Sequence, residues 1–157
     1  MRIQRISLAV SVLAVAGLGL VVYAQPKPVS SRSNVAVVYK TPTCGCCSLW
    51  VEHLKKNGFQ VEVSDVSAAQ VRGVSQAAGL SDDNTSCHTT KIGGYVVEGH
   101  VPAADIQRLL KEKPAVAGIA APGMPMGSPG MEQGGRAEKY DVIAFTKAGK
   151  TSVFARH

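Results

Sequence analysis

Aromatic residues are scarce in this chain, and neither sign of charge dominates it. Phe, Trp and Tyr make up 5% of the 157 residues, and the net charge at pH 7 is +6. The basic residues are scattered and lack the clusters, interleaved with aromatic residues, that bind nucleic acids. We therefore expect no nucleic-acid partner. An apolar fraction of 45% is ordinary for a globular protein, and the length leaves room for one domain.

Cysteine is also sparse, and its four copies are not spaced like a structural framework. Cys44, Cys46 and Cys47 fall within four positions, and Cys87 follows far along the chain. A disulfide between such near neighbours closes almost no loop and therefore stabilises a fold very little. The grouping indicates chemistry at sulfur rather than a disulfide scaffold.

The first 24 residues have the composition of a signal peptide. Arg2 and Arg5 precede an apolar run from Ile6 to Tyr23, and Ala24 offers a small residue for cleavage. No cysteine follows it, so lipoprotein processing is not expected. The apolar run is long enough to span a bilayer, so an uncleaved membrane anchor stays an alternative. We expect three segments: a signal peptide at 1–24, a flexible linker at 25–33 and an exported, periplasmic domain at 34–157.

Hydrophobic periodicity in that domain predicts alternating strands and helices. A β-branched run at 34–39 is typical of a buried strand, and apolar residues at helical spacing follow at 46–57. The remaining segments are a strand at 59–65, a helix capped by Ser67, two strands within 89–100 and a helix after Pro102. The order β-α-β-α-β-β-α predicts an α/β, thioredoxin-like fold, because strand–helix–strand units need a parallel sheet core with helices on its faces.

The segment at 115–139 matches no helix or strand pattern. It is rich in glycine and proline, and a loop of this length inside a compact domain is usually functional or disordered. Strands expected at 140–146 and 151–155 then form an extra C-terminal β-hairpin.

The cysteine cluster lies where the first strand runs into the first helix. Cys44 and Cys47 form a C-x-x-C pair there, and the free N–H groups of a helix N-terminus lower thiol pKa values. A thiolate is both the nucleophile of disulfide exchange and a soft ligand for a soft metal. Cys46 is a third thiol that simple disulfide exchange does not need, and it indicates a metal-binding cluster.

Cys87 and His88 precede the third strand, in a loop that a thioredoxin-like fold places beside the C-x-x-C pair. Proline, which such folds usually carry in this loop, is absent, and its absence argues against ordinary disulfide exchange. We expect Cys87 to be a fourth thiol ligand and His88 to be a candidate ligand or base. A disulfide between Cys87 and one of the three clustered cysteines, Cys46 for example, stays an alternative. No role in the site is expected for His53, His100 or His157.

Further soft ligands occur in the glycine-rich loop, as Met124, Met126 and Met131. Thioethers suit Cu(I) in an oxidising compartment, although methionines on such a loop also fill gaps in packing. With the thiols they favour copper, as one or more Cu(I) ions, over zinc, for which methionine is a poor ligand and the cysteine spacing is unusual.

Four motifs together resemble the CopG-like family of periplasmic copper-resistance proteins. They are CGCC after a strand, SCHTT, GGYVVEGHVPAADIQRLL and PGMPMGSPGME, and they span about residues 35–155. The resemblance implies a thioredoxin-like fold, a role in copper resistance, copper binding through Cys44, Cys46, Cys47 and Cys87, and a redox role.

Two functions stay open at this point. The first is a copper-binding protein that holds Cu(I), hands it to other periplasmic copper-handling proteins, or couples it to thiol redox chemistry. The alternative is an enzyme, a thiol–disulfide oxidoreductase that acts on protein disulfides through Cys44 and Cys47.

Overall fold

The computed structural model describes residues 35–157 apart from 133, 134 and 136. The signal peptide expected at 1–24 and the linker expected at 25–33 therefore lie outside the described residues. Within those residues, no helix has both the length and the apolar character needed to cross a bilayer.

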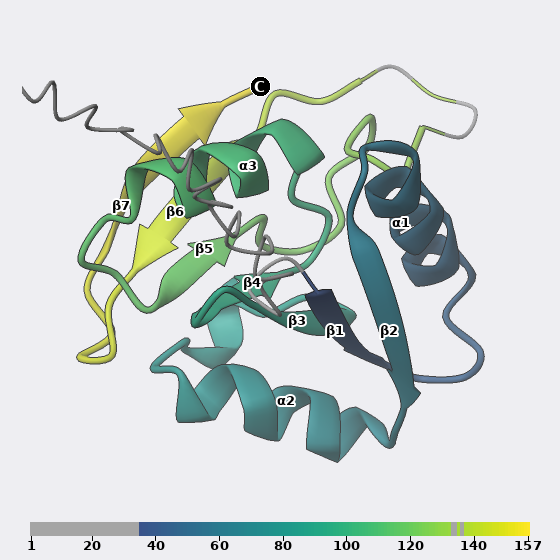
Figure 1. Ribbon diagram of the computed structural model, residues 1–157, viewed down its shortest axis with the longest axis horizontal. Helices are drawn as coiled ribbons and strands as arrows, with labels where there is room; N and C mark the ends of the chain where they lie inside the picture. The colour runs from purple at the N-terminus through teal and green to yellow at the C-terminus, as the bar shows by residue number, and fades with distance from the viewer. Residues whose placement is uncertain (1–34, 133–134, 136) are drawn as a thin grey trace, which may run out of the picture. The chain divides into compact units, whose positions relative to one another are not determined.

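The described residues form a mixed α/β unit with three α-helices and one seven-stranded sheet (Figure 1). The helices are α1 (Gly45–Lys56), α2 (Ala68–Ala77) and α3 (Ala103–Glu112), with a short 3-10 turn at η2 (Asp82–Asn84). The strands are β1 (Val35–Lys40), β2 (Gln60–Asp65), β3 (His88–Ile92), β4 (Tyr95–Glu98), β5 (Gly118–Ala120), β6 (Asp141–Phe145) and β7 (Thr151–Arg156), in the spatial order β2-β1-β3-β4-β5-β6-β7. The α/β class expected from the sequence is confirmed.

The connections explain which strands run parallel. Helix α1 carries the chain from β1 to its parallel neighbour β2, and α3 does the same between β4 and β5. A tight turn at Gly93 and Gly94 instead joins β3 to β4, and these strands pair antiparallel. Parallel neighbours need a long crossover, whereas antiparallel neighbours need only a hairpin.

Strand β5 corrects the expectation that residues 115–139 hold no regular element. This strand of three residues pairs with β4 on one side and β6 on the other. It opens with Gly118, where a side chain would collide with the backbone of Val96 and the ring of Phe145. A strand this short carries no readable periodicity, and through it the C-terminal hairpin of β6 and β7 joins the main sheet.

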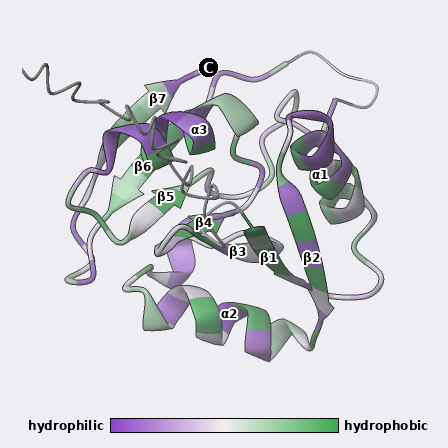
Figure 2. Ribbon diagram, viewed as in Figure 1, coloured by the Kyte–Doolittle hydropathy of each residue, from purple (hydrophilic) through white to green (hydrophobic). Residues whose placement is uncertain are grey.

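Helices cover both faces of the sheet. Side chains on one face, such as Val97 and Ile119, belong to a core with α1 and α3, while Val96 and Phe145 point to the opposite face with the end of α2. Successive strand residues point to opposite faces, so both faces must be covered. Figure 2 shows the inner strand β1 as hydrophobic over its first part, before Tyr39 and Lys40, and the edge strand β2 as alternating.

Candidate metal centre

The site forms where the end of β1, the start of α1 and the start of β3 meet. Cys44 is the N-cap of α1, so Cys46 and Cys47 lie in its first turn. Strand β3 pairs antiparallel with β1, with His88 opposite Lys40. This register brings Cys87, the residue before β3, beside the helix tip although it is 40 positions from Cys47.

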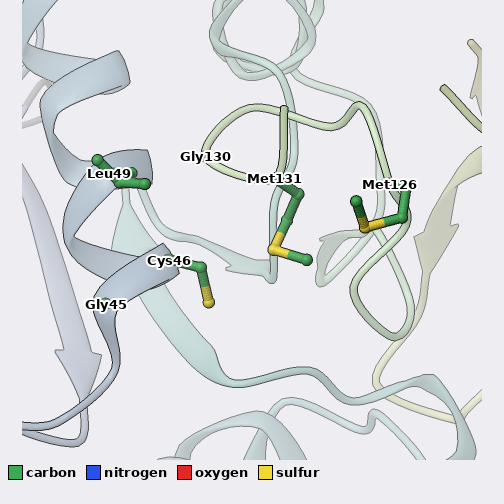
Figure 3. Close-up of a pocket in the computed structure, with 6 residues that line it drawn as sticks. All are labelled: Gly45, Cys46, Leu49, Met126, Gly130 and Met131. Carbon is green, nitrogen blue, oxygen red and sulfur yellow. The ribbon is translucent and has the colours of Figure 1, made fainter. Parts of the chain in front are cut away.

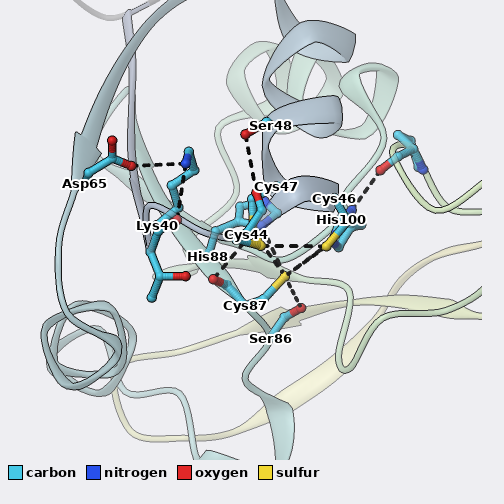
Figure 4. Close-up of a disulfide and its surroundings, with 12 residues drawn as sticks. Lys40, Cys44, Cys46, Cys47, Ser48, Asp65, Ser86, Cys87, His88 and His100 are labelled. Carbon is cyan, nitrogen blue, oxygen red and sulfur yellow. Dashed lines mark hydrogen bonds and ion pairs between the residues drawn. A yellow bond between two sulfur atoms is a disulfide. The ribbon is translucent and has the colours of Figure 1, made fainter.

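The four cysteine sulfurs form a closed ring, which we call the sulfur ring. Cys44 and Cys47 are joined by a disulfide, while Cys46 and Cys87 are free thiols. The Sγ atoms of Cys47 and Cys87 are 3.4 Å apart, those of Cys44 and Cys46 are 3.7 Å apart, and those of Cys46 and Cys87 are 4.0 Å apart (Figure 4). The alternative of a disulfide between Cys87 and one of the three clustered cysteines is therefore wrong for this structure, although the Cys46 and Cys47 sulfurs are its neighbours.

His100 was not expected in the site, yet it is buried and faces Cys87. Its Nε2 atom lies 3.4 Å from Cys87 Sγ, and its Nδ1 atom lies 2.8 Å from the Pro129 carbonyl oxygen. An Nδ1–H donated to that carbonyl leaves the Nε2 lone pair directed at the sulfur, as in many histidine metal ligands. Burial lowers the pKa of His100, and the hydrogen bond to Pro129 opposes the shift.

A signal for His100 was present in the sequence. The turn at Gly93 and Gly94 pairs Ile92 with Tyr95 and Thr89 with Glu98. Continuing this antiparallel register by two residues sets Cys87 opposite His100. Counting outward from the turn therefore predicts that the His100 imidazole lies beside the Cys87 thiol.

His88 is placed beside the thiols, as expected. It is fully buried, its Nδ1 atom lies 3.7 Å from Cys87 Sγ, and its ring packs 4.4 Å from Trp50 and 5.0 Å from His100 between centroids. Burial, reinforced by His100 and Lys40, lowers the pKa of His88 to about 3. The ring is therefore neutral at physiological pH, and its Nε2 has no hydrogen-bond partner among the described residues.

Glu98 anchors the loop that carries Cys87. This buried carboxylate accepts hydrogen bonds from the Ser86 backbone N–H at 2.7 Å and the Thr89 hydroxyl at 2.6 Å. Burial raises the pKa of Glu98 to about 7, although both hydrogen bonds oppose the shift. Burial, with the neighbouring Cys46, also raises the pKa of the Cys87 thiol to about 11.

Comparison with known proteins finds one family model and two solved structures that match this chain. A family model described as "Protein of unknown function, DUF411" matches residues 84–131, which include Cys87 and His100. They also include the segment from Met124 to Met131, which we call the methionine loop. No curated protein matches the chain. Two solved structures titled "Copper resistance protein copG", Form 1 and Form 2, are 43% and 45% identical, with a TM-score of 0.71 each. Both comparisons cover 78% of this chain, and they cover 96% and 97% of the solved chains.

This chain belongs to the CopG family of copper resistance proteins. The resemblance drawn from the four sequence motifs is thus confirmed.

The methionine loop of this CopG family member forms one wall of a hollow beside Cys46. The hollow measures about 510 Å³, and its lining residues are Gly45, Cys46, Leu49, Met126, Gly130 and Met131. Figure 3 shows the Cys46 thiol and the thioethers of Met126 and Met131 on this hollow. Met124 is 52% exposed and is not among the lining residues. Two of the three expected methionines are therefore brought to the site.

Gly130 lets the loop pack directly against the tip of α1. Its φ of +85° is left-handed, and a Cβ there would come within 2.8 Å of the Cys46 carbonyl oxygen and 2.9 Å of the Trp50 backbone nitrogen. Only glycine adopts this conformation and this contact without strain. The close approach positions Met131, the next residue, over the hollow.

The remaining histidines lie outside the site, as expected, and have structural partners. His53 Nε2 accepts the backbone N–H of Ala103, the first residue of α3, at 3.1 Å. His157 Nε2 lies 2.7 Å from the Asp105 carboxylate. Within the part of the chain that the structure describes, neither histidine is hydrogen-bonded to a sulfur of the ring.

The site therefore offers two overlapping sets of ligand atoms. The sulfur ring is one, and Cys87 with His88 and His100 is the other, each with its ligand atoms within 4.8 Å of one another. Thiolate, thioether and neutral imidazole are the ligands that soft or borderline metals such as Cu(I) prefer.

Proposed function

We propose that this protein binds copper as Cu(I) in the periplasm, through the reduced sulfur ring assisted by imidazole and thioether ligands. The observation that carries the proposal is the sulfur ring itself, with all four cysteine Sγ atoms within 4.8 Å. A compact group of thiols shares one or more Cu(I) ions by bridging, because each thiolate has more than one lone pair. The copper-resistance titles of the similar structures support the choice of metal.

The individual ligands have separate parts in this proposal. Cys44, Cys46, Cys47 and Cys87 supply thiolates once the Cys44–Cys47 disulfide is reduced. His100 contributes Nε2 at the buried end, with His88 as a further candidate. Met126 and Met131 line the open side, where neutral sulfur ligands would receive Cu(I) from solution or from another copper-handling protein.

A thiol redox function is the second candidate, and the disulfide favours it. Cys44 and Cys47 form this disulfide at the N-terminus of α1, where helix N–H groups stabilise a thiolate. A thiol–disulfide oxidoreductase needs only these two cysteines. Cu(II) is also a possible oxidant, since two thiolates that form a disulfide deliver two electrons and convert two Cu(II) ions to Cu(I).

The decisive experiment is an anaerobic Cu(I) titration of the fully reduced protein against a competing chelator, with bound copper and free thiols counted together. We expect tight binding with all four thiols protected from alkylation. Failure to compete for Cu(I) would overturn the copper proposal and leave thiol–disulfide exchange as the function.

Two matched substitutions locate the ligands. Met131→Leu removes a thioether that lines the hollow, whereas Met124→Leu removes an exposed one outside it. Only the first should weaken Cu(I) binding. Cys46→Ser separates the two functions, because it should lower the copper complement yet leave reduction of a protein disulfide by Cys44 and Cys47 intact.

A further inference from the structure

Each sulfur of the disulfide has a free thiol beside it. Cys87 Sγ lies 3.4 Å from Cys47 Sγ, and Cys46 Sγ lies 3.7 Å from Cys44 Sγ. Thiol–disulfide exchange proceeds by attack of a thiolate on one sulfur of the disulfide, and the other sulfur leaves. The sulfur ring therefore holds both a disulfide and potential internal nucleophiles within van der Waals contact.

We propose that Cys87 attacks Cys47, so that the disulfide moves within the ring from Cys44–Cys47 to Cys47–Cys87. One S–S bond forms between Cys87 and Cys47, and the bond between Cys47 and Cys44 breaks. The Cys87 thiol proton passes to His100 Nε2, at 3.4 Å, in an uphill step because burial disfavours the Cys87 thiolate, and the bonding electrons leave with Cys44 as a thiolate. The number of disulfides is unchanged, so no outside oxidant or reductant takes part.

Burial directs the attack to Cys47. Its side chain is 0% exposed, so a thiol from solution has no access to this sulfur, whereas Cys87 already touches it. The leaving group is also favourable, because Cys44 is the N-cap of α1 and the dipole of a helix N-terminus stabilises a thiolate placed there. Exchange is faster when the departing thiol has a low pKa.

The exchange changes which thiols are free to bind metal. With Cys44–Cys47 closed, the free pair is Cys46 and Cys87 at the buried histidines. With Cys47–Cys87 closed, the free pair is Cys44 and Cys46 at the helix tip. Cys46 belongs to both pairs, so a Cu(I) ion held there would change its second thiol from the buried side to the outer side. This use of the exchange rests on the proposed copper function, whereas the exchange itself needs no copper.

Tryptic mapping of the metal-free protein tests the exchange. Cleavage after Lys40, Lys55, Arg72 and Lys91 yields peptide 41–55, with three cysteines, and peptide 73–91, with Cys87. Protein that carries the Cys44–Cys47 disulfide and free Cys46 and Cys87 thiols is brought from low pH to neutral pH without oxidant or reductant, quenched in acid at a series of times, alkylated and digested. The Cys44–Cys47 form leaves the two peptides separate, whereas the Cys47–Cys87 form links them.

Substitutions assign the link to one pair of sulfurs. Cys46→Ser removes the other thiol that neighbours Cys87, and this variant should still yield linked peptides. The double variant Cys46→Ser, Cys47→Ser keeps Cys44 and Cys87, and it should yield only separate peptides. Fragmentation of the linked species from the unsubstituted protein should place the bond on Cys47, so the test stands even if a variant fails to fold.

The results distinguish failure of the exchange from failure of the proposed copper function. Separate peptides alone, with Cys87 fully alkylated in the unsubstituted chain and in Cys46→Ser, would overturn the exchange. A protein that binds Cu(I) but forms no linked peptides would retain the proposed function and lose this inference. A protein that links the peptides but does not compete for Cu(I) would retain the exchange and lose the copper function.

Discussion

The sulfur ring has two unlike sides, which we call the helix side and the hairpin side. The helix side is Cys44 to Cys47, contiguous in sequence at the tip of α1, where Cys44 and Cys46 are only partly buried. The hairpin side is Cys87, His88 and His100, which flank the β3–β4 hairpin, and both of its histidines are fully buried. The first side offers reactive sulfur to the surroundings, and the second holds its ligands in fixed positions.

The two sides also differ in the groups that hold their side chains in place. On the helix side, the cysteines lie at the N-terminus of α1, with Cys44 as its N-cap. On the hairpin side, Glu98 holds the loop of Cys87 and the Pro129 carbonyl orients His100. Under the proposed copper function this division has a use, because an accessible ligand would bind first and an oriented one would complete the coordination.

The largest effect is expected where the two sides meet, at Cys87. Its sulfur contacts Cys46, Cys47 and His100, so Cys87→Ser should lower the Cu(I) affinity of the reduced protein by about a hundredfold or more. Changes to groups that merely orient a ligand already cost 10–100-fold. Competition with a chelator measures the loss, and Ser48→Ala, an exposed change on the same helix tip, is the control. Unchanged affinity in Cys87→Ser would remove the hairpin side from the site.

Two buried groups, His88 on the hairpin side and Glu98 behind the Cys87 loop, should give the free energy of unfolding opposite dependences on pH. The pKa of His88 is lowered to about 3, so between pH 6.5 and 3 the unfolded chain binds the extra proton and acid destabilises the fold. The pKa of Glu98 is raised to about 7, so between pH 4.5 and 7 the folded chain binds the extra proton and stability falls as pH rises. From pH 4.5 to 6.5 the two contributions oppose each other.

Removing one of the two groups should reveal the pH dependence that the other gives to the free energy of unfolding. Relative to the unsubstituted metal-free protein, Glu98→Gln should make the free energy of unfolding rise with pH by about 1.4 kcal/mol per pH unit between 4.5 and 6.5. His88→Gln should give the opposite slope over the same range. Urea unfolding at a series of pH values measures both, and slopes of the same sign would show that the two groups are not buried in this manner.

Separating the methionine loop from the helix side should have a smaller effect. In Gly130→Ala the new Cβ meets the Cys46 carbonyl and the Trp50 backbone nitrogen at a left-handed φ, so we expect a loss of about 2 kcal/mol in unfolding free energy. Gly45→Ala is the matched control, because nothing lies within 4 Å of its added Cβ. Thermal unfolding compares the two, and equal melting temperatures would contradict the close packing.

The smallest effect is expected at His53, a residue of α1 that contacts the start of α3 and lies outside the sulfur ring. His53→Ala removes the acceptor for the first N–H of α3 and should cost about 1 kcal/mol of stability, as the loss of a helix cap does. Cu(I) affinity should not change, since His53 lies outside the site. Lys56→Ala, an exposed change nearby, is the control, and a parallel loss of copper binding in His53→Ala would contradict this separation.

The two sides also differ in how far sequence reasoning predicted them. The helix side is local, so the C-x-x-C spacing and the helical periodicity were sufficient to predict it, and the α/β class followed from the same patterns. His100 was missed because its place depends on hairpin register, and β5 was missed because three residues carry no pattern. The sequence also does not predict which cysteines form the disulfide, because any neighbouring pair among four clustered thiols is able to form one.

The backbone of the methionine loop has a consequence for solvent exchange. Its amides are held by carbonyls from within the loop and beyond it: Gly123 N–H by Thr85, Gly127 N–H by Met131 and Met131 N–H by Ser128. Ser128, Pro129 and Gly130 are buried despite lying in a segment rich in glycine. Amide deuterium uptake depends on how often such hydrogen bonds open, rather than on composition. This segment should therefore take up deuterium as slowly as a strand and release its protection as a single unit.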